Sequence, residues 1–588
     1  MSVLHETAED LARLPKHHVA THDEKLVITA SSLGTVFEWY DFYLYGLLTA
    51  IIAAQFLTGL NQTTSFIMAL LVFAAGFIVR PFGALVFGHI GDLFGRRYTF
   101  IITLTVMGLS TFLVGCLPTY KQVGVAAPIM LVVLRMFQGL ALGGEYGGAA
   151  TYVAEHAPAG KRGLYTSWIQ ITATAGLAMA LLIVITVRSP VTGVGEEAFK
   201  QWGWRIPYLI SGLFLVLGLW LRLKLHESPV FQKIKSEGSG SKAPLKDAFG
   251  KWSNLKIVLI AFFGAIAGQA VVWYTGQLYA MYFLEKMLKV DGLTANTLII
   301  TALLLATPFF LFFGMLSDKI GRKPIILTGC ALAALTMFPV FHALTEAANP
   351  ALAHAQANAP VKVMAYPGEC SSQFDPVGAN KFDTTSCDIV KNALAKAAIN
   401  YENVAVPSGS VASVSIGGKT IIAPDPAQVS GEDKKKAIAD FTTALVGKAA
   451  TPAKAAADGK PAVEAKPAVV GELTKVGYPT KADPDQIDKP KVVAILFYLV
   501  LLVTMVYGPI AAMLVELFPS RIRYSSMSLP YHIGNGWLGG LLPAIGFAMV
   551  AANGDIYYGF WYPVIVAAAT FFFGLFFLPE TFRRDIDG

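Results

Sequence analysis

The segment GHIGDLFGRR at residues 88–97 returns in altered form as GMLSDKIGRK at residues 314–323. Each copy lies between two long apolar runs and combines paired glycines, one acidic residue and two or three bases. A polar turn this short suits a hairpin that joins two membrane helices on the cytoplasmic side. Its presence in two copies indicates that the chain consists of two related halves, an arrangement typical of secondary transporters.

The composition indicates a membrane protein. Of the 588 residues, 54% are hydrophobic and 14% are charged, whereas soluble domains carry about 25% charged residues. The net charge of +7 does not indicate a nucleic-acid partner, because the bases lie in short loops beside apolar stretches, where they orient membrane helices. The sequence contains no GxxxxGK[ST] loop and no nucleophile–base or metal-ligand constellation. We therefore expect neither ATP-driven transport, nor an enzyme, nor a cofactor or metal.

The apolar stretches predict an all-α membrane protein with twelve transmembrane helices, most of which reach the ~20 residues that cross a ~30 Å hydrocarbon core. Six spans form a first bundle, at about 27–56, 64–87, 98–117, 126–150, 163–187 and 204–224. Six more form a second bundle, at about 255–284, 294–316, 324–345, 491–514, 525–550 and 556–578. The predicted domains are a tail at 1–26, a first bundle at 27–224, a central loop at 225–254, helices 7–9 at 255–345, and helices 10–12 with a tail at 491–588.

Basic residues gather on one side of the predicted membrane. They are Arg96, Arg97, Lys161, Arg162, Arg222, Lys224, Lys319, Arg322, Lys323, Arg521, Arg523, Arg583 and Arg584, together with the basic segment 233–256. Short loops on the other side hold far fewer, such as Lys121 and Lys200. The positive-inside rule therefore places both termini in the cytoplasm. The first residues show no basic region with a cleavage site, so we expect no removable signal peptide.

The spacing between matching positions reveals an insertion in the second half. Asp318 follows Asp92 by 226 residues, whereas the Glu-x-x-Pro-x-x-x-Arg pattern that begins at Glu155 recurs at Glu516, 361 residues later. The difference places an insertion between the ninth and tenth spans, at 346–490. Because it follows an odd-numbered span, we expect this insertion in the periplasm, and long loops cross membranes largely regardless of their charge.

The insertion has two parts of different character. Residues 449–490 are rich in Ala, Lys, Pro and Asp and indicate a linker, whereas residues 365–448 can fold. Val411 to Ile422, interrupted by two glycines, indicates a β-hairpin. Ser430, followed by acidic residues, can cap a helix.

The four cysteines fall into two pairs. Cys370 and Cys387 lie in the insertion, where an oxidising periplasm would favour a disulfide between them. The alternative is two unrelated thiols in a disordered loop. Cys116 and Cys330 lie in predicted spans, where we expect inert core residues.

Charged residues inside the predicted spans need a reason, because a charge at the bilayer centre costs roughly 2.5–3.5 kcal/mol on insertion scales. In the first span, Glu38, Asp41 and Tyr45 are spaced i, i+3 and i+7 and therefore share one helix face. In the second span, Arg80 lies about two turns from the cytoplasmic end.

The fourth span carries another polar face. Arg135, Gln138 and Glu145 are spaced i, i+3 and i+10. Glycines beside them permit a close approach of helices.

These motifs resemble those of the major facilitator superfamily. The two hairpin segments look like its loops between helices 2 and 3 and between helices 8 and 9, and RMFQG at 135–139 resembles its Arg-x-x-Gln-Gly pattern. EWYDF at 38–42 and RPFG at 80–83 resemble the metabolite:proton symporter branch, which includes transporters of 2-oxoglutarate, citrate, shikimate, and proline or betaine. HESP at 226–229 and PET at 579–581 are similar to paired motifs of sugar porters. The resemblance spans nearly all of the chain except the insertion, and it implies two pseudo-symmetric six-helix bundles in a bacterial inner (plasma) membrane.

The buried charges are candidates for coupling protons to a substrate. Asp41 beside Arg135 would be a carboxylate that responds to burial and to its partner, and its protonation would release Arg135; the alternative is a fixed ion pair. Glu38 is a second proton site or a structural partner of Arg80. Arg80 can bind a carboxylate by a bidentate fork or bridge to Asp92 or a helix end. The proton-coupling set is Asp41, Glu38 and Arg135, and the substrate-binding set is Arg80, Arg135, Gln138 and Tyr45.

Other residues have two interpretations each. Glu145 forms a salt bridge at a gate or contacts substrate, and His532 is a pathway residue or an ordinary buried histidine. Four aromatic residues of the seventh span line the cavity or pack in the core: Trp273, Tyr274, Tyr279 and Tyr282.

The resemblance also implies a latch on the cytoplasmic side. Asp92 and Asp318 can accept hydrogen bonds from helix N-termini, and the neighbouring bases can pair with acids of other helices. Such contacts would hold the halves together while this side is closed; the alternative is that the bases only mark topology. The predicted gate residues are Asp92, Arg96, Arg97, Glu155, Arg162, Glu227, Asp318, Arg322, Glu516, Arg523 and Glu580.

We therefore expect a secondary active transporter that imports a small organic metabolite with protons by alternating access. A carboxylate, such as a dicarboxylate or a shikimate-like acid, is the first choice of substrate. A zwitterion such as proline or betaine is one alternative. Others are an exporter with the same core and a transporter-like receptor that senses a ligand through the insertion. The expected partners are the lipid bilayer, protons and the metabolite, with no nucleic acid and a monomeric protein.

Overall fold

The computed structural model describes residues 22–57, 62–224, 227, 229–238, 241–371, 382–397, 399–448 and 468–586. Most of the predicted tail at 1–26 lies outside these residues. Within them, eleven helices are long and apolar enough to cross a membrane, and the 35-residue helix α2 (His22–Phe56) completes the predicted twelve. The predicted all-α fold of twelve membrane helices is therefore confirmed.

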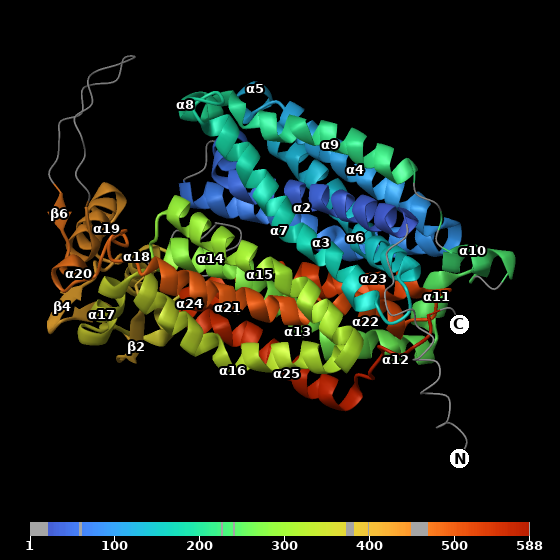
Figure 1. The fold of residues 1–588 in the computed structure, drawn as a ribbon. Helices are drawn as coiled ribbons and strands as arrows, with labels where there is room; N and C mark the ends of the chain where they lie inside the picture. Colours follow the sequence, from blue (N-terminus) through green and yellow to red (C-terminus); the bar gives the residue numbers. More distant parts are fainter. Residues whose placement is uncertain are drawn as a thin grey trace.

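The N-terminal half contains α2 and five further long helices (Figure 1). They are α3 (Gln62–Phe94), α4 (Arg96–Cys116), α6 (Ala126–His156), α7 (Arg162–Arg188) and α9 (Arg205–Leu223). Short segments in its connections are α5 (Tyr120–Val123), α8 (Glu196–Ala198) and η1 (Phe199–Gly203). The predicted central loop is partly helical, because it forms α10 (Pro229–Ser236) and α11 (Pro244–Gly250) at the opposite end of the bundle from α5 and α8.

The C-terminal half begins with one continuous helical run from Trp252 to Met287. Its segments are α12 (Trp252–Ala261), η2 (Phe262–Ile266), α13 (Ala267–Tyr274), η3 (Thr275–Tyr279), α14 (Ala280–Tyr282) and η4 (Phe283–Met287). The next two spans are α15 (Gly292–Ile320) and α16 (Arg322–Ala348). The last three are α21 (Lys489–Tyr507) with α22 (Ile510–Leu517), α23 (Arg523–Ile533) with η6 (Gly534–Gly539) and α24 (Leu542–Asn553), and η7 (Tyr558–Phe560) with α25 (Trp561–Phe577).

Some spans are less regular than the sequence predicted. The span predicted at 491–514 divides into α21 and α22 around Pro509, since proline has no N–H to donate and clashes with the preceding turn. The seventh span contains π-helical turns at η2, η3 and η4. Each π turn accommodates one extra residue, and a hydrophobic period of 3.6 residues does not register such a local change.

Close packing fixes α3 against α6. A Cβ atom at Gly139 would collide with the backbone of Gly76, and one at Gly143 would collide with the backbone of Arg80. Small residues of this kind are what allow membrane helices to approach each other. The contact determines how Arg80 on α3 lies relative to Arg135 on α6.

The insertion between α16 and α21 is a folded α/β unit around a sheet of order β2-β1-β3-β4. Its strands are β1 (Val361–Ala365), β2 (Tyr401–Ala405), β3 (Ser413–Ile416) and β4 (Lys419–Ile422), and its main helices are α17 (Pro350–Asn358), α18 (Ser386–Lys396) and α19 (Gly431–Val446). The predicted hairpin is present as β3 and β4, with positive φ at Gly417 and Gly418, a conformation that glycine adopts without strain. Ser430 occupies the N-cap position of α19, as predicted, but its side chain makes no capping hydrogen bond. The parallel pairing of β1 with β2 was not predicted.

The predicted linker at 449–490 is too long. Residues 449–467 lie outside the described part of the chain, but β6 (Val469–Val470) pairs with β5 (Gly447–Lys448), and α20 (Glu472–Lys475) follows. Leu473 and Tyr478 are buried. A local composition rich in Ala, Lys and Pro concealed these contacts, because they are made with residues distant in sequence.

Three of the four cysteines have the predicted state, and Cys116 does not. Cys370 and Cys387 form a disulfide, with their Cα atoms 5.3 Å apart. Cys330 is buried, but Cys116 is exposed. The expectation of a core position is therefore wrong for Cys116, which lies at the last turn of α4.

The insertion docks on two loops of the C-terminal half. In the first loop, the Lys289 carbonyl accepts a hydrogen bond from the Ala482 N–H at 3.0 Å, and Lys289 Nζ donates to the Pro479 carbonyl at 3.0 Å. In the second loop, the Gly554 carbonyl accepts from the Tyr401 N–H at 3.0 Å. Figure 1 shows the insertion at the opposite end of the molecule from α10 and α11.

Candidate functional site: a central cavity and a latch

At the end of the molecule near α10 and α11, each half caps a helix of the other half. The Asp92 carboxylate accepts hydrogen bonds from the Tyr524 and Ser525 N–H groups at 3.3 and 2.9 Å, in the first turn of α23. The Asp318 carboxylate accepts from two N–H groups in the first turn of α7, at 2.8 and 2.9 Å. A negative charge is favoured there, because the free N–H groups and the helix dipole point at it. The two contacts repeat the duplication seen in the sequence.

Buried ion pairs surround the Asp318 cap. Arg322 Nη1 lies 2.7 Å from Asp318, and its Nη2 lies 3.1 Å from Glu516. Arg162 Nη1, from the other half, lies 3.9 Å from Glu516. Arg322 and Glu516 are almost completely buried, so each needs the other to offset its lost hydration.

The pseudo-symmetric counterpart of the Arg162–Glu516 contact is an ion pair between Arg523 and Glu155. Arg523 Nη1 lies 2.9 Å from Glu155 Oε1, and its Nη2 donates to the Ile586 carbonyl at 2.8 Å. We use the term latch for the contacts that cross between the halves: those of Asp92 and Asp318 with helix N-termini, Arg523 with Glu155, and Arg162 with Glu516.

Two further predicted gate residues act within their own halves. Glu580 accepts hydrogen bonds from the Arg322 and Lys323 N–H groups at 2.9 and 3.0 Å, at the start of α16. Glu227 accepts from the Arg97 N–H at 3.3 Å, at the start of α4. Through these hydrogen bonds the two residues anchor the ends of helices in their own bundles. The side chain of Arg96, also predicted at the gate, lies outside the described part of the structure.

A cavity of about 20 Å³ lies between the halves, at the depth where α2, α3 and α23 carry polar residues. Glu38, Arg80 and His532 are among its lining residues. Glu38 Oε2, Arg80 Nε and both ring nitrogens of His532 have no hydrogen-bond partner among the described residues. This volume holds about one water molecule, so a metabolite fits only when the halves move apart here.

Aromatic rings form most of the wall of this cavity. Tyr146 of the N-terminal half stacks on Tyr531 of the C-terminal half with ring centres 3.8 Å apart, and Trp39 faces Trp273 at 5.3 Å. The wall also includes Phe42, Tyr274 and Tyr507. Of the aromatic residues singled out in the seventh span, Trp273 and Tyr274 line this cavity, whereas Tyr279 packs against Phe547 and Phe560.

Asp41 does not form the predicted direct ion pair with Arg135. Its Oδ2 accepts a hydrogen bond from Thr111 Oγ1 at 2.9 Å, and Thr111 Oγ1 accepts from Gln138 Nε2 at 2.8 Å. Gln138 Oε1 in turn accepts from Arg135 Nη1 at 2.7 Å. The two charges are therefore connected through two neutral side chains inside the N-terminal half, and the Arg135 guanidinium also lies 4.3 Å from the centre of the Tyr45 ring.

Arg80 is not part of this series of hydrogen bonds, and no ion pair between Arg80 and Asp92 is found among the described residues. Its guanidinium lies 4.6 Å from the ring centre of Phe77. A further cavity of about 10 Å³ has both Arg80 and Arg135 in its wall. The residues predicted to form the site thus fall into two neighbouring groups. Glu38 and Arg80 lie at the central cavity between the halves, and Asp41, Gln138, Arg135 and Tyr45 lie within the N-terminal half.

Glu145 belongs to neither the latch nor the central cavity. It forms an ion pair with Arg222 on α9, and it accepts a hydrogen bond from Thr103 Oγ1 at 2.7 Å. Arg222 also donates to the Phe100 carbonyl at 2.7 Å. From the sequence, Arg222 was predicted only to orient the helix. Its position before the end of the predicted span allows its side chain to reach inward, and this position is the signal for the ion pair.

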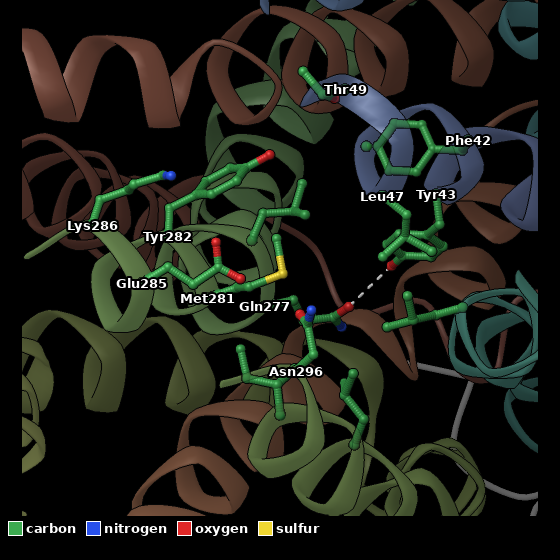
Figure 2. A pocket seen from close by; sticks show the side chains of 15 residues that line it. Phe42, Tyr43, Leu47, Thr49, Gln277, Met281, Tyr282, Glu285, Lys286 and Asn296 are labelled. Atoms are coloured by element: carbon green, nitrogen blue, oxygen red, sulfur yellow. Dashed lines mark hydrogen bonds between the residues drawn. The ribbon is translucent and has the colours of Figure 1, made fainter. Parts of the chain in front are cut away.

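Figure 2 shows a larger cavity of about 210 Å³. It lies toward the insertion end, because its residue Lys286 also lines a cavity formed with residues of the insertion. Its wall includes Thr49, Tyr282, Glu285 and Lys286. A hydrogen bond of 3.3 Å from Tyr43 Oη to Gln277 Oε1 joins the halves at its inner side. We name this cavity the vestibule. The latch holds the halves together at one end, and the vestibule lies on the side away from it.

The chain matches known transporters over most of its length. A family model described as sugar (and other) transporter matches residues 26–253, 237–365 and 469–588. The proline/betaine transporter of Salmonella typhimurium is 36% identical over 325 residues, which cover 53% of this chain and 63% of that protein. The alpha-ketoglutarate permease of Escherichia coli is 34% identical over 323 residues, which cover 55% of this chain and 72% of the permease. Most of the insertion has no counterpart in the family model.

The fold also matches solved structures. A proton:xylose symporter of the major facilitator superfamily, XylE, superposes with a TM-score of 0.60 at 15% identity, over 96% of this chain and 98% of that one. At this level of identity the likeness concerns the fold. It agrees with two bundles of six helices each.

Proposed function

This chain belongs to the sugar (and other) transporter family of the major facilitator superfamily, and from that premise we propose that it imports a small zwitterion together with protons by alternating access. The family consists of membrane transporters and not of enzymes. The cytoplasm would lie at the latch and the periplasm at the insertion, in a bacterial inner membrane. The vestibule would then be the route by which substrate arrives.

The central cavity is the observation that supports a zwitterion. Arg80 offers a planar fork for a carboxylate, and Glu38 offers carboxyl oxygens for an ammonium group. The aromatic wall adds faces that attract cations, and aromatic cages are a recurrent means of binding quaternary ammonium groups. Three of the relatives carry the name proline/betaine transporter, which is consistent with such a substrate.

A dicarboxylate is the second candidate. Arg80 and Arg135 both line the small cavity between the two polar groups, so two guanidinium groups are available for two carboxylates. The alpha-ketoglutarate permease among the relatives is consistent with this alternative. The candidates differ in their need for Glu38, because a dicarboxylate gains nothing from an anionic neighbour.

Uptake into proteoliposomes distinguishes these candidates. We expect radiolabelled glycine betaine or proline to accumulate when an inward proton gradient is imposed, and a protonophore to abolish the accumulation. Glu38→Gln should reduce zwitterion uptake more than tenfold. If the protein takes up 2-oxoglutarate and Glu38→Gln does not change the rate of that uptake, the dicarboxylate is favoured. Full uptake without a proton gradient would contradict proton coupling.

A matched pair of tryptophans tests the aromatic wall. Trp273 lines the central cavity, whereas Trp204 is equally buried but packs against Phe56 within the N-terminal half. Trp273→Leu should raise the KM for glycine betaine by about tenfold, in line with a desolvated cation–π contact. Trp204→Leu should change expression or stability without changing KM. Equal KM values in both variants would remove the aromatic wall from the binding site.

A further inference from the structure

A cavity of about 270 Å³ lies at the seam between the insertion and the loop that follows η4. The membrane part contributes Lys286 and Lys289 to its wall, and the insertion contributes a mainly apolar surface that includes Ile399, Val446 and Leu473. We name it the seam cavity. It is separate from the central cavity, and its volume is close to the lower limit of about 300 Å³ for small-molecule pockets.

The contacts that dock the insertion also shape this cavity. The hydrogen bonds between Lys289 and the segment 479–482 hold one wall in place. Tyr478, in another part of the wall, donates its hydroxyl to the Ala359 carbonyl at 2.9 Å. Ile399 and Leu473 in the apolar floor are buried members of the hydrophobic core, and Val446 is partly buried against that core. The walls are therefore part of the fold on both sides of the seam.

The charge of the wall has one sign. Among the residues that line the seam cavity, only Lys286 and Lys289 carry a formal charge, and both are cations. Burial lowers the pKa of Lys289 to about 8, because its ammonium group is taken from water, and the hydrogen-bond partner that the described residues offer it is the neutral Pro479 carbonyl. An anion at this position would restore the lost interaction. The apolar floor disfavours a strongly hydrated ion such as free phosphate and favours an organic acid with a hydrocarbon body.

We propose that the seam cavity binds a small organic monocarboxylate, with the carboxylate beside Lys286 and Lys289 and the hydrocarbon body against Ile399, Val446 and Leu473. Lys286 also lines the vestibule. The bound acid therefore lies next to the route by which substrate would reach the central cavity. This site depends only on the seam between the insertion and the C-terminal half, and not on the identity of the transported substrate.

Protection of a thiol tests the site in the full-length protein. Thr474 is an exposed residue in the seam wall, and Thr474→Cys in a Cys116→Ser background gives an impermeant thiol reagent one target there. We expect hexanoate to slow the labelling of this cysteine at least fivefold in proteoliposomes. Hexylammonium, with the same chain and the opposite charge, should give no protection. Lys289→Gln should raise the half-protecting concentration of hexanoate about tenfold or more, the loss expected for one charge-assisted hydrogen bond.

Two controls separate binding from unfolding of the insertion. Thr442 lines a different cavity of the insertion, between α18 and α19, so hexanoate should leave the labelling of Thr442→Cys unchanged. Lys289→Arg should restore protection, because it restores the cation. The site is refuted if hexanoate gives no protection, if hexylammonium protects equally, if Lys289→Gln changes nothing, or if Thr442→Cys is protected to the same extent.

The protection should also depend on pH. Lys289 loses its charge as the pH rises through about 8, so protection by hexanoate should weaken between pH 7 and pH 9.5. The other titratable groups in the wall are Lys286 and Tyr478, and burial raises the pKa of Tyr478 to about 12, which leaves it neutral over this interval. Protection that stays constant over the interval would exclude Lys289 as the group that holds the carboxylate.

Discussion

Asp41 is connected to Arg135 through Thr111 and Gln138, by hydrogen bonds of 2.7 to 2.9 Å. If Asp41 carries the proton, Asp41→Asn should keep substrate exchange but lose accumulation against a gradient, since asparagine preserves the shape and removes the titratable group. Counterflow and gradient-driven uptake in proteoliposomes measure the two activities. Thr111→Ser keeps the hydroxyl and serves as the control. Normal accumulation by Asp41→Asn would exclude the role.

Glu516 illustrates how much depends on a buried charge. Glu516→Gln removes one of the two carboxylates that offset the buried charge of Arg322, the other being Asp318, and it should destabilise the protein by about 3 kcal/mol. The matched control is Glu196, whose pair with Arg188 is exposed at 2.6 Å; the hydrogen bond from Arg188 lowers the pKa of Glu196 to about 2. Because water screens that pair, Glu196→Gln should cost roughly 0.2–1 kcal/mol. Thermal unfolding of the detergent-solubilised protein compares the two, and similar losses would contradict the assignment of Glu516 to a buried network.

The packing of α3 on α6 makes a prediction about these two helices. Gly143→Ala places a methyl group against the backbone of Arg80, and overpacking of this kind typically costs 1–3 kcal/mol. At Gly46, inside α2, the same substitution meets open space, so Gly46→Ala should leave the unfolding temperature unchanged or raise it slightly. The unfolding temperatures of the two variants test this contrast. Equal values would mean that α3 and α6 can separate without strain.

Some structural elements could be predicted from the sequence and others could not. The twelve helices were predictable, because hydrophobic runs are local signals, and the reciprocal helix caps were expected from the family resemblance of the repeated motif. The pair of Arg222 with Glu145 and the relay through Thr111 were not, since each joins residues of different helices whose rotation the sequence does not specify. The same reason hid the pairing of β1 with β2. Contacts between distant segments become visible only once the helices and strands have been placed.

For the complete protein, we predict that the insertion is separable from transport. Replacing 350–487 with a short flexible linker should leave gradient-driven uptake largely intact, because Glu38, Asp41, Arg80, Arg135 and His532 all lie outside it. The unfolding temperature should fall, since the hydrogen bonds to the loops at Lys289 and Gly554 are lost. Uptake and unfolding are measured on the same preparation. A stable deletion variant that no longer binds substrate would make the insertion a capture domain and revive the receptor hypothesis.

The docking of the insertion has a consequence for how motion could be observed. Among the described residues, its hydrogen bonds to the membrane helices run to the loops of one half. If the halves rock against each other, the insertion must move together with the C-terminal half, to which it is bound. A fluorophore on α19 paired with one near α8, on the other half, would then report each swing as a change in energy transfer. The position of the insertion relative to the N-terminal half would thus report the conformation of the transporter, from a site outside the lipid.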